Sequence, residues 1–385
     1  MDLKDCYTEN HCPRLLISSE SAPPYASGVS TVVNQMTKYL DNWNVLILAP
    51  DTSYSTLNDK PVVRLPSVKL PMYSGLNAVI PQRPHVRKQI KKCLDEFKPD
   101  VILTIGGAFL ASTTAYLGKS RNIPIVGLND TDFITYATHY GLGRFAGSIG
   151  RLTKWLHRSN TVTLVTSPSY HKKLDSVGFT NLRQWRLGID IEEFSPQHRT
   201  DDLKQTVLEQ YPDTQVICLI VSRLASEKSI DQLHPIAKLE GVTLVVVGDG
   251  PEYQILQEQF ADTRTIFLGR KDNKKSELSQ LYASADIFLC ASRSETFGLT
   301  VLEATASGVP CVIADGNGIR DIVVHDKTGY ICSNQAEMIR YVENLRDNPQ
   351  HRSQMSAAAR QEGLRYSWKI VMQELEAILL ESINH

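Results

Sequence analysis

Short runs of Val, Ile and Leu alternate with helical patterns along the whole chain. In the first half, the runs that predict strands are residues 14–18, 44–48, 101–104, 123–127 and 162–165. In the second half they are residues 216–221, 243–247, 265–268, 287–290 and 309–313. Between the early runs, apolar residues recur three or four positions apart, which predicts amphipathic helices. Two such series are Val29, Val32, Val33, Met36 and Leu40, and then Val86, Ile90, Leu94 and Phe97.

This alternation predicts an α/β fold built on parallel sheets. Because most positions of the strand candidates are apolar, without a strict alternation with polar residues, helices should cover both faces of each sheet. A polar stretch at residues 197–202 divides the pattern into two similar halves. We therefore expect two Rossmann-like, doubly wound domains, residues 1–194 and 195–365, that face each other across a cleft. Residues 366–385 follow as a last helical pattern, with apolar residues at Ile370, Leu375, Ile378 and Leu379.

Composition narrows the class of protein. The chain has 385 residues, of which 42% are hydrophobic and 22% charged, and its formal net charge is −1. That balance argues against a protein whose main task is to bind nucleic acid. No apolar run approaches the roughly 20 residues of a transmembrane helix, and the polar first 13 residues do not resemble a signal peptide. Seven scattered cysteines without C-x-x-C spacing favour a reducing compartment, so we expect a cytoplasmic protein without a zinc site.

The strongest local motif is residues 294–303, Ser-Glu-Thr-Phe-Gly-Leu-Thr-Val-Leu-Glu, which follow the strand candidate 287–290. Ligands bind parallel sheets of this kind at the carboxyl ends of the strands. A helix that begins near Gly298 would present free amides and the positive end of its dipole to a phosphate. Glu295 precedes this helix and Glu303 lies inside it, so the two carboxylates could bind different hydroxyls of one extended ligand. The alternative is two solvated glutamates beside an ordinary helix cap.

A second motif follows the strand candidate 216–221. Arg223 and Lys228 lie on either side of a strand-to-helix loop. Two cations at a strand end could neutralise a diphosphate through charge-assisted hydrogen bonds. The alternative is a pair of solvated surface cations.

Other strand exits carry glycine or arginine. Gly248 and Gly250 belong to a Gly-Asp-Gly turn after residues 243–247, and Arg270 follows residues 265–268. Gly28 lies between the first strand and the first helix, where it would let the loop approach a ligand. Each of these glycines could equally be a simple turn residue.

Several common motifs are missing. The chain has no P-loop, no G-x-G-x-x-G after its first strand, no G-x-S-x-G and no H-E-x-x-H. There is also no D-x-D pair in the usual metal-binding setting, except Asp130 with Asp132, which follow the strand candidate 123–127.

Together these segments resemble family 4 of the retaining glycosyltransferases, which have the GT-B fold. The resemblance covers nearly the whole chain and rests on four elements in the family's order. They are Arg223 with Lys228, residues 248–251, the E-x7-E pair Glu295 and Glu303, and residues 188–190 with Phe194 at the domain junction. The sequence at residues 227–230 and 156–158 is most similar to that of the glycolipid-forming sulfoquinovosyltransferase branch.

The resemblance implies a role for each of these residues. It implies that the donor diphosphate is held by Arg223, Lys228, Gly28, Gly298, Leu299 and Thr300. It implies that Glu295 and Phe297 lie at the donor sugar and that Glu303 binds the ribose. It implies that the base is framed by strand exits at Gly248, Gly250 and Arg270. It further implies that the last helix crosses back onto the first domain and that the enzyme needs no metal or other cofactor.

The chain departs from the family at Asp130 and Asp132, where relatives in the sulfolipid branch carry histidines. These aspartates could accept hydrogen bonds from sugar or acceptor hydroxyls, and one could act as a base, so we place them with Glu295 as candidate catalytic residues. A carboxylate there would repel an anionic sugar, which favours a neutral one. The alternative is an aspartate that caps the segment after it.

The resemblance implies transfer of a sugar from a UDP- or GDP-sugar to a hydroxyl of a glycan or a glycolipid, without nucleic acid as a partner. Two alternatives remain, a GT-B nucleotide-sugar epimerase and a non-catalytic binding subunit. Two basic stretches could bring the protein to an anionic membrane surface. One contains Arg83, Arg87, Lys88, Lys91 and Lys92, and the other has Arg144, Arg151, Lys154 and Arg158 around Trp155. The alternative for both is a solvated helix face.

Overall fold

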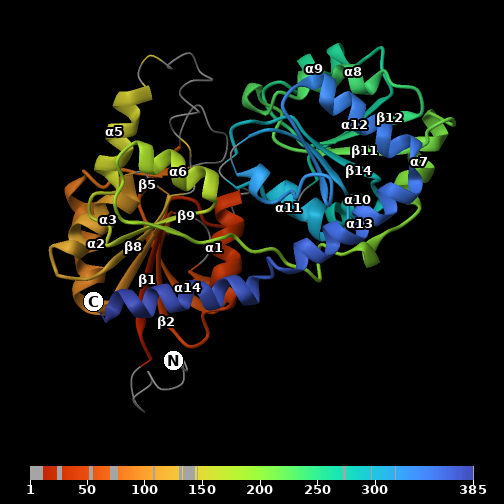
Figure 1. Ribbon diagram of the computed structural model, residues 1–385. Coiled ribbons are helices and arrows are strands. Elements are labelled where there is room, and N and C mark those ends of the chain that lie inside the picture. The colour runs from red at the N-terminus through yellow and green to blue at the C-terminus, as the bar shows by residue number, and fades with distance from the viewer. Residues whose placement is uncertain are drawn as a thin grey trace.

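The computed structural model describes residues 12–23, 28–51, 55–69, 77–106, 109–129, 132, 144, 146–271, 275–295, 297–316 and 318–384. The described residues form two lobes that lie side by side (Figure 1). Each lobe is a largely parallel sheet with helices on both faces, as the alternating pattern of the sequence predicts.

The first sheet has the strand order β10-β9-β8-β7-β1-β2-β4-β3. All neighbours are parallel except β3 and β4, and a separate antiparallel ribbon pairs β5 with β6. The order reverses between β1 and β7, so the first sheet has its switch point there. The strands are β1 Arg14–Ser19, β2 Asn44–Pro50, β3 Thr56–Leu57, β4 Lys60–Leu65, β5 Ser67–Lys69, β6 Asn77–Val79, β7 Val101–Ile105, β8 Ile125–Asn129, β9 Val162–Val165 and β10 Leu182–Gln184.

Helices of the first lobe begin where the sequence provides a suitable residue. In α6, the hydroxyl of Ser167 accepts a hydrogen bond from the amide of Tyr170, and Pro168 occupies the first turn. In α2, Pro84 begins the helix, and its buried stripe is Val86, Ile90 and Leu94. The helices are α1 Gly28–Lys38, α2 Pro84–Phe97, α3 Phe109–Lys119, α5 Ala146–Leu156 and α6 Pro168–Ser176.

The second sheet is parallel throughout and has the order β13-β12-β11-β14-β15-β16. Its first strand, β11, lies in the middle beside β14, so the order reverses between these two strands. Sheets of this kind bind ligands at such a switch point, and the region at the carboxyl ends of β11 and β14 is called the crevice below. The strands are β11 Val216–Val221, β12 Val242–Val247, β13 Thr265–Gly269, β14 Ile287–Cys290, β15 Cys311–Ala314 and β16 Gly329–Cys332.

Helices precede, connect and follow these strands. The α-helices are α7 Asp202–Gln210, α8 His234–Ala237, α9 Tyr253–Gln259, α10 Lys275–Ser284, α11 Leu299–Ala306, α12 Gln335–Asp347 and α13 Pro349–Leu364. The 3-10 helices are η3 Pro196–His198, η4 Ser226–Lys228, η5 Ile230–Leu233 and η6 Ile319–Asp321. The five residues of β11 from Val216 to Ile220 are all buried, which holds the loop after it on a rigid base.

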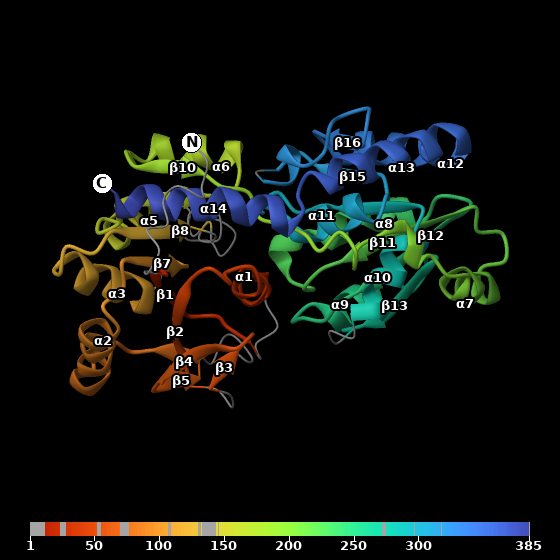
Figure 2. The ribbon, with the colours of Figure 1, turned by 90° about the horizontal axis from the view of Figure 1, so that it is seen from below.

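The last helix, α14 (Trp368–Ile383), leaves the second lobe and packs along the first, as Figures 1 and 2 show. Trp43 Nε1 donates to Glu376 Oε1 at 3.1 Å, and Trp185 Nε1 donates to the carbonyl oxygen of Val371 at 2.9 Å. The segment that joins the lobes is held by Arg360, whose guanidinium donates to the carbonyl oxygens of Phe194 and Ile191. The predicted return of the last helix to the first lobe is therefore confirmed.

Candidate functional site

The two loops at the switch point of the second sheet carry opposite charges that meet. Lys228 lies at the end of η4, after β11, and Glu295 lies after β14. Lys228 Nζ is 2.5 Å from Glu295 Oε1, and both side chains are about one-fifth exposed. Burial alone would raise the pKa of Glu295, but the Lys228 ammonium and its hydrogen bond outweigh burial and lower it. Glu295 is thus an ionised carboxylate beside a cation.

Arg223 is the second cation of this crevice, and its partner was not among the predicted site residues. The guanidinium forms an ion pair with Glu227, whose side chain is buried while that of Arg223 stays 38% exposed. The hydroxyls of Ser292 and Ser294 both donate to the backbone carbonyl of Glu227 at 3.4 Å. The i, i+4 spacing of Arg223 and Glu227 in the sequence is the signal that could have identified this pair.

The helix that follows Glu295 begins where the sequence predicts. Gly298 caps α11 with a φ of 93°, and a Cβ at this position would collide with the side chain of Ile319. Glycine is therefore required by both backbone conformation and space. Leu299 and Thr300, both half-buried, form the first turn of α11 and present its free amides.

Phe297 lies differently from the simplest expectation for a sugar contact. Its side chain is only 4% exposed, and its ring packs against that of Tyr366 at 6.3 Å between centroids. The ring therefore belongs to the core, and the backbone is the part of Phe297 that remains for a ligand.

Gly28 brings the first lobe to the same place. It is the first residue of α1, and a Cβ there would lie 3.3 Å from Leu299 Cδ1 in the first turn of α11. The N-terminus of α1 therefore meets that of α11 across the two lobes. The structure brings together Gly28, Leu299 and the loop of Glu295, although these segments lie far apart in the sequence.

Glu303 lies inside α11, half-buried, and its Oε2 accepts a hydrogen bond of 2.6 Å from the hydroxyl of Tyr282 in α10. Burial raises the pKa of Glu303 to about 7, and the hydrogen bond from Tyr282 offsets this only in part. The other carboxyl oxygen of Glu303 can still accept a hydrogen bond from a hydroxyl group.

The glycines after β12 let two strand exits pack against each other. A Cβ at Gly248 would collide with the carbonyl oxygen of Ser222, and one at Gly250 with that of Leu224. The amide of Leu224 also donates to the carbonyl oxygen of Asp249 at 2.9 Å. These glycines thus position the loop of Arg223, a structural task that does not test their predicted place beside a base. Arg270 is exposed at the exit of β13, two strands away from β11.

The first lobe contributes a buried ion pair. Asp130 lies outside the described residues. Asp132, which follows β8, is 2% exposed and pairs with Lys173 of α6. At the end of β8, Asn129 Oδ1 accepts a hydrogen bond of 2.9 Å from the hydroxyl of Tyr170, also in α6. Asn129 and Asp132 are thus both held by α6.

The start of α6 also contacts the second lobe. Ser169 donates from its hydroxyl to Asp321 Oδ2 at 2.6 Å and from its amide at 3.0 Å, and its hydroxyl accepts from the amide of Gly318 at 2.9 Å. Because Ile319 of the same loop packs at Gly298, a continuous series of contacts joins α6 to the N-terminus of α11. The two lobes therefore present their strand ends to one another in a defined arrangement.

Taken together, the crevice combines two cations, two helix N-termini, the two partly exposed carboxylates of Glu295 and Glu303, and the buried carboxylate of Glu227. Arg223 and Lys228 with the first turns of α1 and α11 suit a diphosphate. Glu295 and Glu303 suit hydroxyl groups on either side of it. Among the described residues, no group of three or more His, Cys, Asp or Glu side chains could hold a metal ion.

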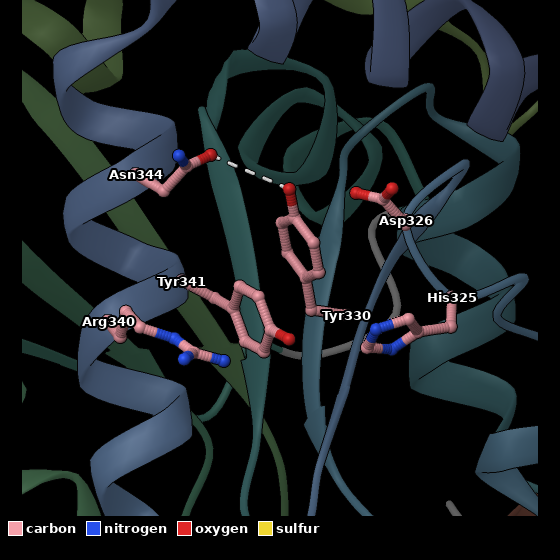
Figure 3. Close-up of a pocket in the computed structure, with 6 residues that line it drawn as sticks. All are labelled: His325, Asp326, Tyr330, Arg340, Tyr341 and Asn344. Atoms are coloured by element: carbon pink, nitrogen blue, oxygen red, sulfur yellow. Dashed lines mark hydrogen bonds between the residues drawn. The ribbon is translucent and has the colours of Figure 1, made fainter.

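A separate hollow of about 320 Å³ lies beside β16, an edge strand of the second sheet. Its lining residues, drawn in Figure 3, are His325, Asp326, Tyr330, Arg340, Tyr341 and Asn344. The rings of Tyr330 and Tyr341 stack at 3.9 Å, His325 lies edge-on to both, and Arg340 lies over Tyr341.

Two family models match the chain. "Glycosyltransferase Family 4" matches residues 26–193, and "Glycosyl transferases group 1" matches residues 204–362. A GDP-mannose-dependent alpha-mannosyltransferase of Mycobacterium tuberculosis is 31% identical over 94% of this chain and 95% of its own length. The sulfoquinovosyl transferase SQD2 of Arabidopsis thaliana is 28% identical over 92% and 71%. The alpha-monoglucosyldiacylglycerol synthase of Acholeplasma laidlawii is 26% identical over 96% and 98%.

Solved structures agree with this result at the level of the fold. HepE of Anabaena, solved in complex with UDP, superposes with a TM-score of 0.76 over 96% of this chain and all of its own. At 19% sequence identity, that likeness concerns the architecture of two facing Rossmann-like domains.

Proposed function

This chain belongs to the family 4 glycosyltransferases, whose fold is GT-B, and we propose that it transfers mannose from GDP-mannose to a hydroxyl of a lipid-linked or glycan acceptor. It is a nucleotide-sugar-dependent glycosyltransferase, as its relatives are. The relatives are transferases and a synthase, which favours transfer over an epimerase or a non-catalytic subunit. GDP-mannose is supported by the mycobacterial relative.

The observation that carries the proposal is the charge cluster at the switch point of the second sheet. In the proposed complex, Arg223 and Lys228 bind the donor diphosphate beside the helix N-termini at Gly28 and Gly298. Lys228 is held by Glu295 at 2.5 Å, so the site already orients a cation and a carboxylate together. When the diphosphate binds Lys228, Glu295 is released from its ion pair and can accept hydrogen bonds from hydroxyls of the sugar.

The nucleoside lies on the other side of the diphosphate in this proposal. Glu303 accepts a ribose hydroxyl, and Tyr282 orients its carboxyl group. The base lies between the exits of β12 and β13, near Gly250 and Arg270. Two cations and two helix ends supply the positive charge that the leaving diphosphate needs, so we propose that transfer requires no metal.

The acceptor enters from the first lobe. Asp132 accepts a hydrogen bond from a sugar or acceptor hydroxyl, and Lys173 fixes its orientation. Asp130 remains a candidate base on the strength of its sequence position. Retention of configuration is what the family resemblance implies.

A lipid-linked acceptor is supported by the outer face of the first lobe. Trp155 and Leu152 of α5 are 55% and 54% exposed, and Arg158 lies 3.8 Å over the ring of Trp155. The helix α3 adds Phe109 and Tyr116, with exposures of 57% and 50%. Arg87 of α2 lies over Tyr116, and Lys119 of α3 donates to the carbonyl oxygen of Arg158. The two basic stretches thus lie on either side of α3.

We therefore propose that α2, α3 and α5 form one basic face with exposed aromatic rings that contacts anionic lipid. Among the described residues, no helix has the length and apolar character needed to cross a membrane. Replacing Leu152 and Trp155 by Ser should weaken sedimentation with phosphatidylglycerol vesicles by about tenfold or more. Ile255→Ser is the matched control, because Ile255 is 62% exposed on α9 of the other lobe. Equal sedimentation of both variants would contradict the proposed lipid contact.

The donor is tested by thermal unfolding of the pure protein with GDP, UDP, ADP and TDP and with their sugars, each with and without EDTA. A ligand at 100 times its Kd adds about 2.7 kcal/mol of stability. We expect the largest shift with GDP or GDP-mannose, unchanged by EDTA, and release of GDP when a lipid acceptor is added. A shift confined to UDP would replace the proposed donor, and a shift abolished by EDTA would contradict metal-free binding.

A further inference from the structure

Glu227 is a carboxylate that the fold buries completely beside the proposed donor site. Its side chain has no exposed surface, and the charge is balanced by the guanidinium of Arg223. A buried carboxylate without such a partner would be strongly destabilising. The pairing with Arg223 is therefore maintained, whatever ligand the outer side of the guanidinium meets.

Glu227 also connects the two loops that form the crevice. Its backbone carbonyl accepts the hydroxyls of Ser292 and Ser294, which precede Glu295 in the loop after β14. Both serines are buried, at 1% and 5% exposure. Glu227 thus holds Arg223 on its own loop. It also fixes the neighbouring loop, which carries Glu295.

We propose that Glu227 is a positioning residue for the donor, one that orients Arg223 so that the exposed side of its guanidinium faces the diphosphate. This inference rests on the proposed function, since it assumes that Arg223 meets the diphosphate. A guanidinium has five N–H groups in a fixed plane and can serve a carboxylate on one side and a phosphate on the other. A lysine ammonium has no such fixed geometry.

The second pair of the crevice behaves differently. Lys228 and Glu295 are both partly exposed, so a diphosphate can replace Glu295 at Lys228 and leave Glu295 to the sugar. Glu227 has no access to solvent and cannot be exchanged in this way. The donor site therefore consists of one permanent pair that sets geometry and one exchangeable pair that responds to the ligand.

A purely structural role for Glu227 predicts a general loss of stability instead. A double-mutant cycle separates the two roles because a positioning residue acts only through the residue that it orients. GDP and inorganic pyrophosphate are titrated by calorimetry into the unaltered protein, Glu227→Gln, Arg223→Ala and the double variant. We expect Glu227→Gln to weaken both ligands by about tenfold or more, since the hydrogen bonds at stake are charge-assisted. We expect Glu227→Gln to cause no further loss in the Arg223→Ala background.

Asp213→Asn is the matched control, because Asp213 pairs with Arg264 in the same lobe and is exposed. It should bind both ligands like the unaltered protein. Unchanged affinity in Glu227→Gln would overturn the positioning role, and so would losses that add in the double variant. If Glu227→Gln or Arg223→Ala does not fold, Arg223→Lys tests the same geometry with the charge of Glu227 still balanced, and full affinity in it would overturn the proposal. Failure of the unaltered protein to bind GDP, UDP or pyrophosphate would overturn the proposed function itself, together with this role.

Discussion

The strand ends of the two lobes treat charge in different ways. In the second lobe, Arg223 and Lys228 reach the crevice from one short loop, and their side chains remain partly exposed beside their carboxylate partners. In the first lobe, Asp132 is almost fully buried and is closed off by Lys173. The donor side thus offers cations to a ligand, whereas the acceptor side offers a neutralised pair that fixes the chain. The comparison suggests that donor binding depends on charge and that acceptor binding depends on shape and orientation.

The largest effect is expected from Lys228→Ala. This change removes a cation at the point where negative charge develops on the leaving diphosphate, so kcat/KM for sugar transfer should fall by about a hundred- to a thousandfold. The measurement is release of GDP from GDP-mannose in the presence of acceptor. Lys238→Ala is the control, because Lys238 is an exposed cation of the same lobe that pairs with Asp262. Transfer at the full rate in Lys228→Ala would remove the charge-based account of the donor side.

Asp132→Asn tests the acceptor side of this comparison. It removes the buried carboxylate that pairs with Lys173, so stability should fall by about 1–3 kcal/mol, while the affinity for GDP stays unchanged. Transfer should fall by about a hundredfold if the carboxylate accepts a reacting hydroxyl. The double variant Asp132→Asn with Lys173→Met should regain stability without regaining transfer. Recovery of both would show that the pair is purely structural.

The sequence predicts the interior of both sheets closely. Three strand candidates coincide with β9, β11 and β14, because a short run dominated by apolar residues has few alternatives to a buried parallel strand. The candidate at 123–127 is shifted by two residues from β8, Ile125–Asn129, since Asn129 continues the strand despite its polar side chain. The last helical pattern corresponds to α14.

Edge strands, and contacts between residues far apart in the sequence, are harder to predict from the sequence. β4 contains Pro61 and Lys60, which resemble a turn, and β16 has only four residues and begins with Gly329. In the site, local motifs identify Arg223 and Lys228, but the pairing of Lys173 with Asp132 spans 41 residues and depends on how α6 packs. The burial of Phe297 likewise depends on Tyr366, which returns from the end of the chain. Such contacts require the folded topology.

Glu303 allows the donor side to be probed by pH. Burial raises its pKa from 4.5 to about 7, so between these values the folded protein binds more protons than the unfolded chain does. Stability from this group is present at low pH and is lost as the pH rises through 7, by an amount on the order of 3 kcal/mol. Chemical denaturation from pH 4 to 8 should therefore show a flatter profile for Glu303→Gln than for the unaltered protein. Tyr282→Phe should move the transition to higher pH, because the bond from Tyr282 lowers this pKa. Identical profiles in all three proteins would contradict the assignment.

The smallest effect is expected where the two sides meet. Ser169→Ala removes the hydroxyl that donates to Asp321 and accepts from the amide of Gly318, so the loop beside Gly298 loses two of its hydrogen bonds to α6. The two hydrogen bonds together contribute about 1–3 kcal/mol, part of which the amide of Ser169 retains through its own bond to Asp321. We expect KM for the donor to rise by about three- to tenfold with kcat unchanged, because the contact aligns the lobes but does not touch the reacting atoms. Ser176→Ala, which changes an exposed serine of the same helix, is the control. A loss in kcat instead would mean that the contact acts on the chemical step, and the separation of donor and acceptor sides would no longer hold.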